Sequence, residues 1–369
     1  MLMMSLGAAG VGGAAETEHA FRDAVRQAVW DRVISGGTWW VERRGASSHG
    51  AYGFAVKVPP EQKMLAREET IFDVASLTKV TATTPCVMRL VEERRLDLKA
   101  PVKTYLPAFA GEGREKTTVR QLLAHTSGLR PGLSRQTPWS GYEEGIRLAS
   151  ETVPMDAPDA VFRYSDINFI LLGELVRLVS GKPLEVFAKE TVFDPLGMAD
   201  TGFKPVAALR GRIAATEKDE TGTLLHGVVH DPTARLMGGV AGHAGLFSTA
   251  RDLARYARCV MNGGKLEGRR ILKGETVRLM TTVATPKRMT EKRALGWDVD
   301  TKYSRPRGGF TVGKSFGHTG FTGCCLWIEP ASSAFFVFVS NRLHETDPET
   351  DSRALYEVLG GIAAQWGAG

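Results

Sequence analysis

The sequence predicts an α+β fold: an antiparallel sheet flanked by helices and built from both ends of the chain, with an inserted all-α domain. Three observations favour this fold. A helix pattern and two strand patterns open the chain, helical segments and long loops fill residues 97–235, and apolar strand runs with a helix close it. The predicted boundaries are 18–75 together with 236–369 for the sandwich, and 76–235 for the mostly helical insertion.

A helix and two strands are predicted near the amino terminus. Apolar residues recur at spacings of three and four within 18–34, which is the pattern of an amphipathic helix, and Gly36-Gly37 ends it. Residues 38–42 and 48–56 are typical of two paired strands, which Pro59-Pro60 terminates.

The middle of the chain is predicted to be helical. One helix is expected from Ser76 to about Arg95, with a kink allowed at Pro85 because proline removes a helix hydrogen bond. The clearest helix covers 167–180 and ends at Gly181.

The carboxyl-terminal part returns to the sheet. A glycine-rich stretch, 238–245, is followed by a helix over 249–261. Short apolar runs at 324–328 and 334–340 predict two antiparallel strands, because the residues between them are too few for a crossover. Asp347-Pro348 is expected to cap a last helix.

Composition excludes several classes of protein. The 369 residues include 47 Lys and Arg against 41 Asp and Glu, a net charge of +6 without a long basic block, so no nucleic-acid partner is predicted. No apolar run reaches the ~18 residues of a membrane span. Four cysteines without a C-x-x-C pair argue against a disulfide scaffold and a zinc ribbon. The oligomeric state stays open.

Residues 1–17 are expected to lie outside the fold. Within them, Met1 to Ala15 carry no charge and end in Gly13-Ala14-Ala15, which fits either a disordered start or the remnant of a secretory signal. The first alternative favours a cytoplasmic protein and the second a periplasmic or secreted one.

The first candidate for chemistry is Ser76-Leu77-Thr78-Lys79, an S-x-x-K motif at the predicted start of a helix. Residues three apart share a helix face, so Lys79 is expected to reach the Ser76 hydroxyl. A serine is a poor nucleophile until a neighbour takes its proton, and a nearby ammonium favours the developing alkoxide. The same pattern also fits an N-cap serine beside a solvated lysine.

Two further motifs add polar groups. Tyr164-Ser165-Asp166 precedes the helix over 167–180, and a phenol beside an ammonium can act as a base. His318-Thr319-Gly320 precedes a strand, where a cation and a hydroxyl can hold a substrate carboxylate and the glycine lets substrate lie against the backbone. The next N–H, that of Phe321, is placed to donate to an oxyanion.

In order and separation, these motifs resemble those of the serine beta-lactamase and penicillin-binding protein superfamily, specifically class C beta-lactamase-like proteins and the D,D-peptidases and esterases close to them. Residues 76–79 match S-x-x-K, 164–166 occupy the Y-x-N position, and 318–320 occupy the K-T-G position. The resemblance covers about residues 20–365. It implies the beta-lactamase/transpeptidase fold, with the active site at the junction of the two domains.

The resemblance also implies roles for these residues. Ser76 is the nucleophile, and Lys79 and Tyr164 shuttle its proton to the leaving group. The N–H groups of Ser76 and Phe321 stabilise the oxyanion. Substrate is bound by Asp166 and by the three residues of the His318 motif, His318, Thr319 and Gly320.

Two positions depart from the family pattern. Asp166 stands where the family usually has Asn, and an ionised carboxylate only accepts hydrogen bonds, so it is expected to pair with Lys79 and leave Tyr164 as the base. His318 replaces Lys. Near its ordinary pKa of about 6.5 it is expected to be partly charged at neutral pH, so that carboxylate anchoring weakens as the pH rises.

A metal site is the competing interpretation of another region. His226, His230, Asp231 and His243 form the densest group of histidines, but neither H-E-x-x-H nor H-x-H occurs. Hydrogen bonding within loops is the favoured interpretation, and no metal or cofactor is predicted.

The sequence therefore predicts a serine hydrolase that cleaves an ester or amide bond through an acyl-enzyme. The expected substrate is a small molecule or peptide, with a D-amino-acid-containing peptide leading by resemblance. A promiscuous carboxylesterase and a penicillin-binding or sensing protein without turnover are the alternatives.

Overall fold

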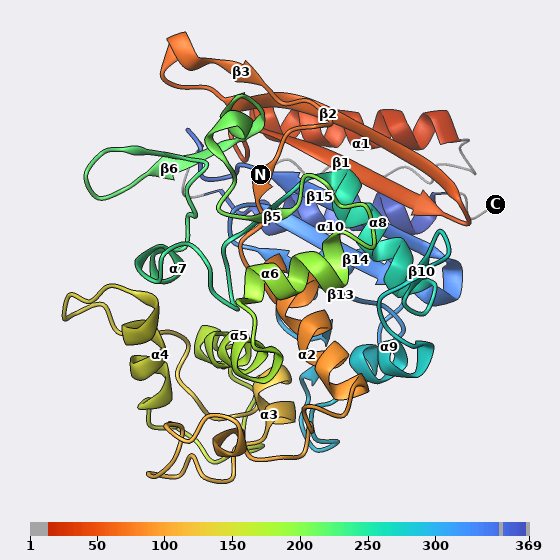
Figure 1. Cartoon of the computed structure of the whole chain (residues 1–369). Helices are drawn as coiled ribbons and strands as arrows, with labels where there is room; N and C mark the ends of the chain where they lie inside the picture. Colours follow the sequence, from red (N-terminus) through yellow and green to blue (C-terminus); the bar gives the residue numbers. More distant parts are fainter. Residues whose placement is uncertain (1–13, 347–349, 367–369) are drawn as a thin grey trace.

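The computed structural model describes residues 14–346 and 350–366, and its centre is an antiparallel sheet of eight strands (Figure 1). The strand order is β11-β12-β13-β14-β15-β1-β2-β3, so the two ends of the chain meet in one sheet. The bounds in that order are Lys292–Arg293, Asp298–Asp300, Phe316–Gly320, Cys324–Glu329, Ala334–Ser340, Gly36–Arg43, Ala46–Val56 and Met64–Leu65.

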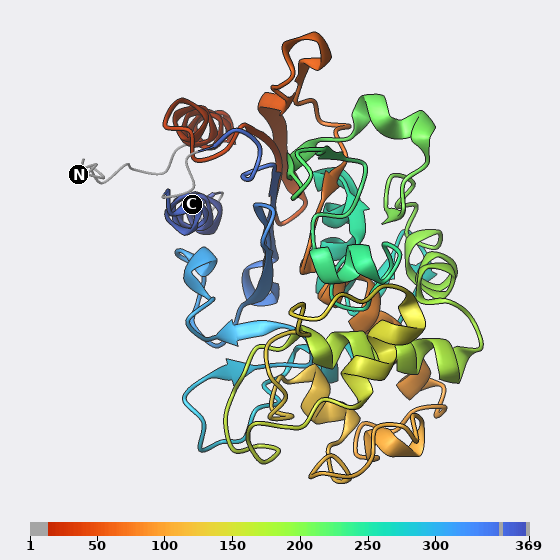
Figure 2. The same cartoon turned by 90° about the vertical axis from the view of Figure 1, so that its left-hand side faces the viewer.

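Helices cover both faces of this sheet. Seen along the sheet's edge in Figure 2, α1 (Ala14–Trp30) and α10 (Ser352–Gln365) lie together on one face, and α8 (Ala250–Met261) lies on the other with the helical part of the chain. This is the predicted α+β architecture, which is confirmed.

Alternating side chains on the strands supply the two cores. On β1, Trp39 packs toward α1 and α10, whereas Trp40 packs toward the opposite core. On β14, Cys325 packs toward α1 and α10, whereas Cys324 packs toward the opposite core, and both are free thiols. The period of two along a strand thus explains why adjacent residues in both pairs face opposite layers.

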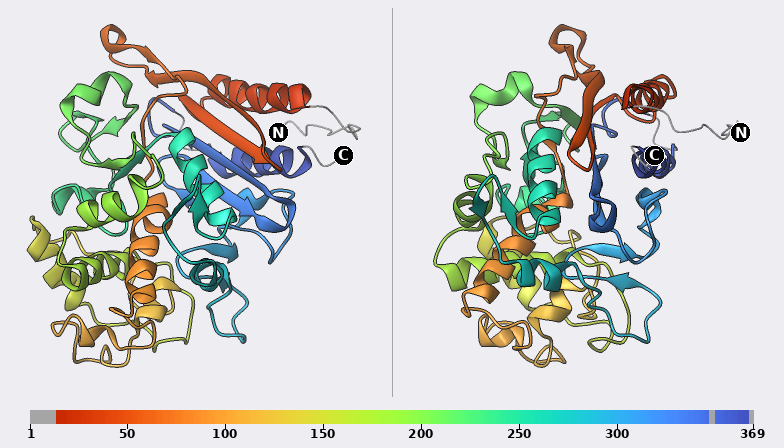
Figure 3. Two further views of the ribbon diagram at one scale, coloured as in Figure 1. Left: turned by 45° about the vertical axis from the view of Figure 1, so that its right-hand side comes forward. Right: turned by 90° about the vertical axis from the view of Figure 1, so that its right-hand side faces the viewer.

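The chain between β4 (Phe72–Asp73) and β8 (Leu246–Ser248) contains most of the remaining helices, which Figure 3 shows below the sheet. It also contains short strands, so this segment is not purely helical, and its boundaries as a domain stay a prediction. The helices are α2 (Thr84–Glu92), α3 (Val119–Leu123), α4 (Tyr142–Ser150), α5 (Asp166–Ser180), α6 (Leu184–Ala188) and α7 (Pro232–Leu236), and the strands are β5 (Gly202–Phe203), β6 (Ala215–Lys218) and β7 (Leu224–His226). Beyond β8 lie β9 (Lys265–Leu266), β10 (Arg269–Arg270) and α9 (Gly274–Thr281).

The helix predicted from Ser76 to about Arg95 is present, since the chain is helical from Leu77 to Glu92, and the irregularity allowed at Pro85 is a π-helical turn over Lys79–Thr83, directly before α2. Asp347-Pro348 lies outside the described residues, and the cap of α10 is Asp351, whose carboxylate accepts the Arg353 N–H.

Among the described residues, no helix is both long enough and apolar enough to cross a membrane.

The glycine-rich loop after α7 reaches the site through a close contact with α5. A Cβ on Gly242 would lie 1.9 Å from the Phe169 carbonyl oxygen and 2.9 Å from the Gly173 N atom. Thr83 also donates its hydroxyl to the Gly242 carbonyl at 2.6 Å. Only glycine allows this approach, which fixes the position of the following residue, His243.

We expect Gly242→Ala to lower the free energy of unfolding by about 1–3 kcal/mol, because the added methyl overpacks against helix backbone that cannot move aside. Denaturant unfolding measures the change. Gly211→Ala is the matched control, because Gly211 is exposed and nothing lies within 4 Å of its added Cβ. Equal stability of the two variants would contradict the contact.

Candidate active site

Ser76 lies in a tight turn between β4 and the helical turn that begins at Leu77. The preceding Ala75 has a left-handed φ of +44°, which is uncommon for a residue with a Cβ. Its N–H donates to the Asp73 carboxylate at 2.8 Å. This local hydrogen bond holds the turn that presents Ser76 to the cleft.

Asp73 connects three parts of the site, and sequence analysis missed it. Besides binding Ala75, its carboxylate accepts the His230 N–H at 2.7 Å, and its carbonyl accepts the Thr322 hydroxyl at 2.6 Å. Burial raises the pKa of Asp73, while the two N–H donors act against that rise. An aspartate two residues before a turn residue is the sequence signal for such a local bond.

Lys79 is fully buried, and all three of its N–H donors have acceptors. Nζ lies 2.9 Å from Ser76 Oγ, 2.8 Å from Asp166 Oδ1 and 3.0 Å from the His243 carbonyl oxygen. Burial alone lowers the pKa of Lys79, but the charges of Asp166 and Tyr164 outweigh it and raise the pKa. Lys79 is therefore charged, and the expected pairing with Asp166 is present.

Tyr164 lies just before α5, with aromatic neighbours that hold its ring. The Lys79 ammonium is 5.0 Å from the ring centroid. His125 stacks on the ring at 4.5 Å, and its Nδ1 accepts the Ser165 N–H at 3.1 Å. Burial, Arg293 and Lys79 lower the pKa of His125 well below 6.5, so this imidazole is a neutral support for Tyr164.

The His318 motif lies in β13, and one expectation about it is wrong. His318 is not partly charged at neutral pH, because burial, Arg293 and Lys79 lower its pKa well below 6.5. The expected role of Gly320 toward substrate stays a prediction, and the glycine also has a packing role: a Cβ there would lie 2.4 Å from the Val74 carbonyl oxygen, so the glycine lets β13 approach the Ser76 turn.

Two backbone donors are free next to Ser76. Among the hydrogen bonds of the described residues, none uses the N–H of Ser76 or of Phe321. The exposed Phe321 ring lies against His230 and Arg342, and Arg342 Nε donates to the Phe321 carbonyl at 2.7 Å. These contacts hold the Phe321 backbone at the mouth of the cleft.

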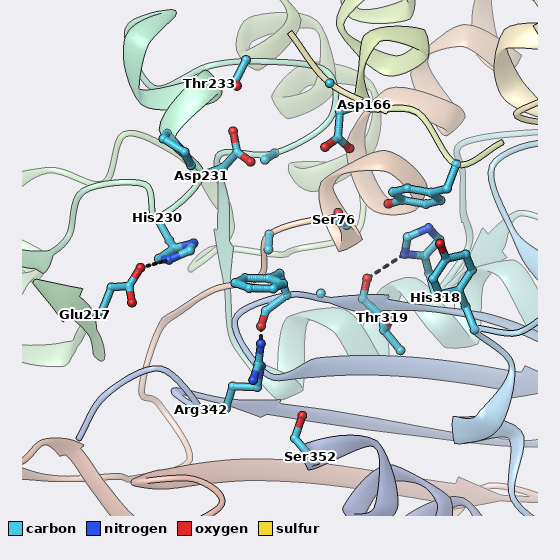
Figure 4. Close-up of a pocket in the computed structure, with 18 of the residues that line it drawn as sticks. Ser76, Asp166, Glu217, His230, Asp231, Thr233, His318, Thr319, Arg342 and Ser352 are labelled. Carbon is cyan, nitrogen blue, oxygen red and sulfur yellow. Dashed lines mark hydrogen bonds and ion pairs between the residues drawn. The ribbon is translucent and has the colours of Figure 1, made fainter. Parts of the chain in front are cut away.

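Apart from the buried Lys79, every residue predicted for the site lines one cleft of about 1210 Å³, part of which Figure 4 shows. These residues are Ser76, Tyr164, Asp166, His318, Thr319, Gly320 and Phe321. The structure thus brings together residues of the turn after β4, of the start of α5 and of the end of β13, which are far apart in the sequence.

The histidine-rich region contributes to the site only in part. His243 Nε2 lies 2.9 Å from Asp231 Oδ1, and both residues lie near Asp166, with ligand atoms within 4.8 Å of one another. His226 and His230 instead bind the Ile213 carbonyl and Glu217. A metal ion bound by Asp166, Asp231 and His243 would have to compete with the Lys79 ammonium, which Asp166 already binds.

This fold and this cleft fit a hydrolase related to the beta-lactamases. The family model described as Beta-lactamase matches residues 21–359, and the chain belongs to that family.

Two curated relatives are similar to most of this chain. A protein of Escherichia coli strain K12, provisionally named D-alanyl-D-alanine carboxypeptidase, is 31% identical over 81% of this chain and 76% of its own length. The N-acetylmuramyl-L-alanine amidase of Bacillus subtilis strain 168 is 32% identical over 81% of this chain and 75% of its own length.

Solved structures share the fold. EstCE1, a hydrolase with promiscuous acyltransferase activity, aligns with a TM-score of 0.76 at 21% identity, covering 95% of this chain and 99% of its own. A class C beta-lactamase aligns with a TM-score of 0.76 at 20% identity, covering 94% of this chain and 96% of its own.

We expect Asp166→Asn to lower the free energy of unfolding by about 2 kcal/mol, because it leaves the buried Lys79 ammonium without its counter-ion. We expect a smaller loss of stability than for a fully buried ion pair, because the Asp166 side chain is 33% exposed. Adding Lys79→Met removes the unpaired charge, so the double variant should lose less stability than the sum of the single variants.

Denaturant unfolding at pH 7 of the four proteins of this cycle measures the coupling. The exposed pair Lys182 and Glu190 is the matched control, since both side chains are 47% exposed and its coupling should stay under about 1 kcal/mol. Purely additive losses at Lys79 and Asp166 would show that the pair is not coupled.

Proposed function

We propose that this hydrolase cleaves an amide or ester bond through an acyl-enzyme on Ser76, and that its substrate is a peptide containing a D-amino acid. The observation that carries the proposal is the Lys79 ammonium, held 2.9 Å from Ser76 Oγ by Asp166 and the His243 carbonyl. A positive charge fixed at this distance stabilises the serine oxygen as it becomes negative.

In the proposed first step, Ser76 Oγ attacks the substrate carbonyl carbon. Charged Lys79 has no lone pair to accept the serine proton, and it therefore acts through its charge. Tyr164 takes the serine proton as it passes its own hydroxyl proton to the leaving group, so that the carbonyl–leaving-group bond breaks with the proton balance kept.

The N–H groups of Ser76 and Phe321 stabilise the oxyanion of the tetrahedral intermediate. Each such donor contributes about 3 kcal/mol in other hydrolases. In the second step water attacks the acyl carbon and returns a proton to Ser76 Oγ along the same path, which releases the acid product.

The cleft supports a peptide as substrate. Its volume of about 1210 Å³ exceeds the 300–1,000 Å³ typical of pockets for single small ligands. The names of the two curated relatives each denote an enzyme that cleaves an amide bond at alanine. Amide hydrolysis is therefore the leading proposal, with carboxylesterase activity and binding without turnover as its alternatives.

We expect Ser76→Ala to abolish acylation, because Ser76 is the serine whose hydroxyl oxygen lies 2.9 Å from the Lys79 ammonium. Hydrolysis of p-nitrophenyl acetate and of an N-acyl-D-alanyl-D-alanine peptide, with intact mass followed after mixing with benzylpenicillin, measures each step. Ser134→Ala is the control, because Ser134 is an exposed serine between two residues of the cleft wall.

The outcomes separate the alternatives. Hydrolysis of the peptide supports the proposal, and hydrolysis of the ester alone identifies a carboxylesterase. A lasting adduct without hydrolysis identifies a binding protein. Full activity of Ser76→Ala would contradict the acyl-enzyme mechanism.

We expect Tyr164→Phe to lower kcat/KM for the peptide about 10²–10⁴-fold, because it removes the hydroxyl that relays the proton. Steady-state kinetics measures the loss. Tyr303→Phe is the matched control, because Tyr303 lines the same cleft with its ring centroid 5.6 Å from that of Tyr164. An equal loss in both variants would point to general damage rather than proton transfer.

A further inference from the structure

Arg342 follows β15, lines the cleft and offers it free hydrogen-bond donors (Figure 4). Its Nε donates to the Phe321 carbonyl at 2.7 Å, and the guanidinium lies 4.7 Å from the centroid of the Phe321 ring. Among the described residues, no acceptor binds either Nη atom of Arg342, and neither of these atoms is buried. A molecule in the cleft can therefore reach both Nη atoms.

The charge of Arg342 is not neutralised by its surroundings, because the guanidinium forms no ion pair within the part of the chain that the structure describes. Several carboxylates of the same cleft wall have other partners: Glu217 binds His230, Asp231 binds His243, and Asp351 binds Arg305 and Arg353. An anion bound at Arg342 would thus meet a cation that no acidic side chain already holds.

The other arginines of the cleft wall differ from Arg342. Arg293 is only 1% exposed and shares its charge with Asp298, and Arg235 lies 3.6 Å from a Glu220 oxygen. Arg135 is exposed, and within the described residues no hydrogen bond or ion pair holds its guanidinium. Arg342 combines an available charge with a fixed position, which lowers the entropy lost when a ligand binds.

Arg342 lies on the acyl side of Ser76. In the proposed mechanism Tyr164 protonates the leaving group, and its ring lies 5.9 Å from that of His318. Figure 4 shows His318 on one side of Ser76 and Arg342 on the other. With the leaving group directed toward Tyr164, the acyl group extends toward Phe321 and Arg342.

We propose that Arg342 binds a carboxylate on the acyl part of the substrate, so that the enzyme prefers acyl groups that carry a negative charge. This inference rests on the proposed function and specifies its substrate. The two free Nη atoms can donate a pair of hydrogen bonds to the two oxygens of a carboxylate, the geometry for which a guanidinium is suited. The bond from Nε to the Phe321 carbonyl holds the side chain for this contact.

The test compares two anilides with the same scissile bond, N-succinyl-D-alanine p-nitroanilide and N-succinamoyl-D-alanine p-nitroanilide. They differ only in a terminal carboxylate that is replaced by a carboxamide. We expect the wild type to favour the succinyl anilide by about tenfold in kcat/KM. Arg342→Met should bring this ratio close to one, and Arg342→Lys should keep a smaller preference, because it retains the charge but not the planar pair of donors.

The ratio separates recognition from general damage. Arg342 also holds the Phe321 carbonyl, so its replacement is expected to slow both anilides, and a reduced folded fraction cancels within each variant. Arg135→Met is the matched control, because it removes another cation of the same cleft wall and should leave the ratio unchanged. Added NaCl should lower the ratio of the wild type but not that of Arg342→Met, because salt screens a partly exposed ion pair.

Three results would overturn the inference: equal kcat/KM values for the two anilides in the wild type, a preference for the succinamoyl anilide, or a succinyl preference that Arg342→Met retains. For an anilide that turns over too slowly, its inhibition constant against p-nitrophenyl acetate supplies the ratio, with the same three outcomes. The acetate ester has no carboxylate and reports on Ser76 alone. Failure of the wild type to hydrolyse the ester and both anilides would count against the proposed function, whereas ester hydrolysis with an equal ratio counts only against the role of Arg342.

Discussion

The structure of this site depends on keeping one ammonium group charged inside the protein. Burying an unpaired ammonium is unfavourable by several kcal/mol, and Lys79 avoids that penalty only by giving each N–H an acceptor. The three acceptors come from the Ser76 turn, the start of α5 and the loop after α7. The position of Ser76 is therefore tied to the helical part of the chain and cannot be set by the sheet alone.

The backbone around Lys79 follows from this requirement. The π-helical turn over Lys79–Thr83 is an unusual conformation that often occurs at functional sites, and the left-handed Ala75 precedes Ser76. Asp73 holds Ala75, and Gly242 lets the next carbonyl reach Lys79. Each locally unfavourable conformation is thus offset by a contact from a distant segment.

The sequence was sufficient for the four central strands of the sheet, β1, β2, β14 and β15, because their apolar patterns are local properties, but it did not predict the four outer strands. It also grouped Ser76, Tyr164 and His318 through motif order. It did not reveal Asp73, the support of Tyr164 by His125 or the neutral state of His318, because each depends on which residues the fold places nearby. Only the short spacing between Asp73 and Ala75 left a local signal.

The two departures from the family pattern form one electrostatic change. Asp166 neutralises Lys79, and His318 contributes no charge of its own where a lysine would add one. Both substitutions make the inner cleft less positive, and with the proton on Nδ1 the His318 side chain offers an acceptor instead of a donor. Asp166 thus offsets the Lys79 charge without removing it, so the ammonium stays 2.9 Å from Ser76 Oγ while its surroundings carry less net positive charge.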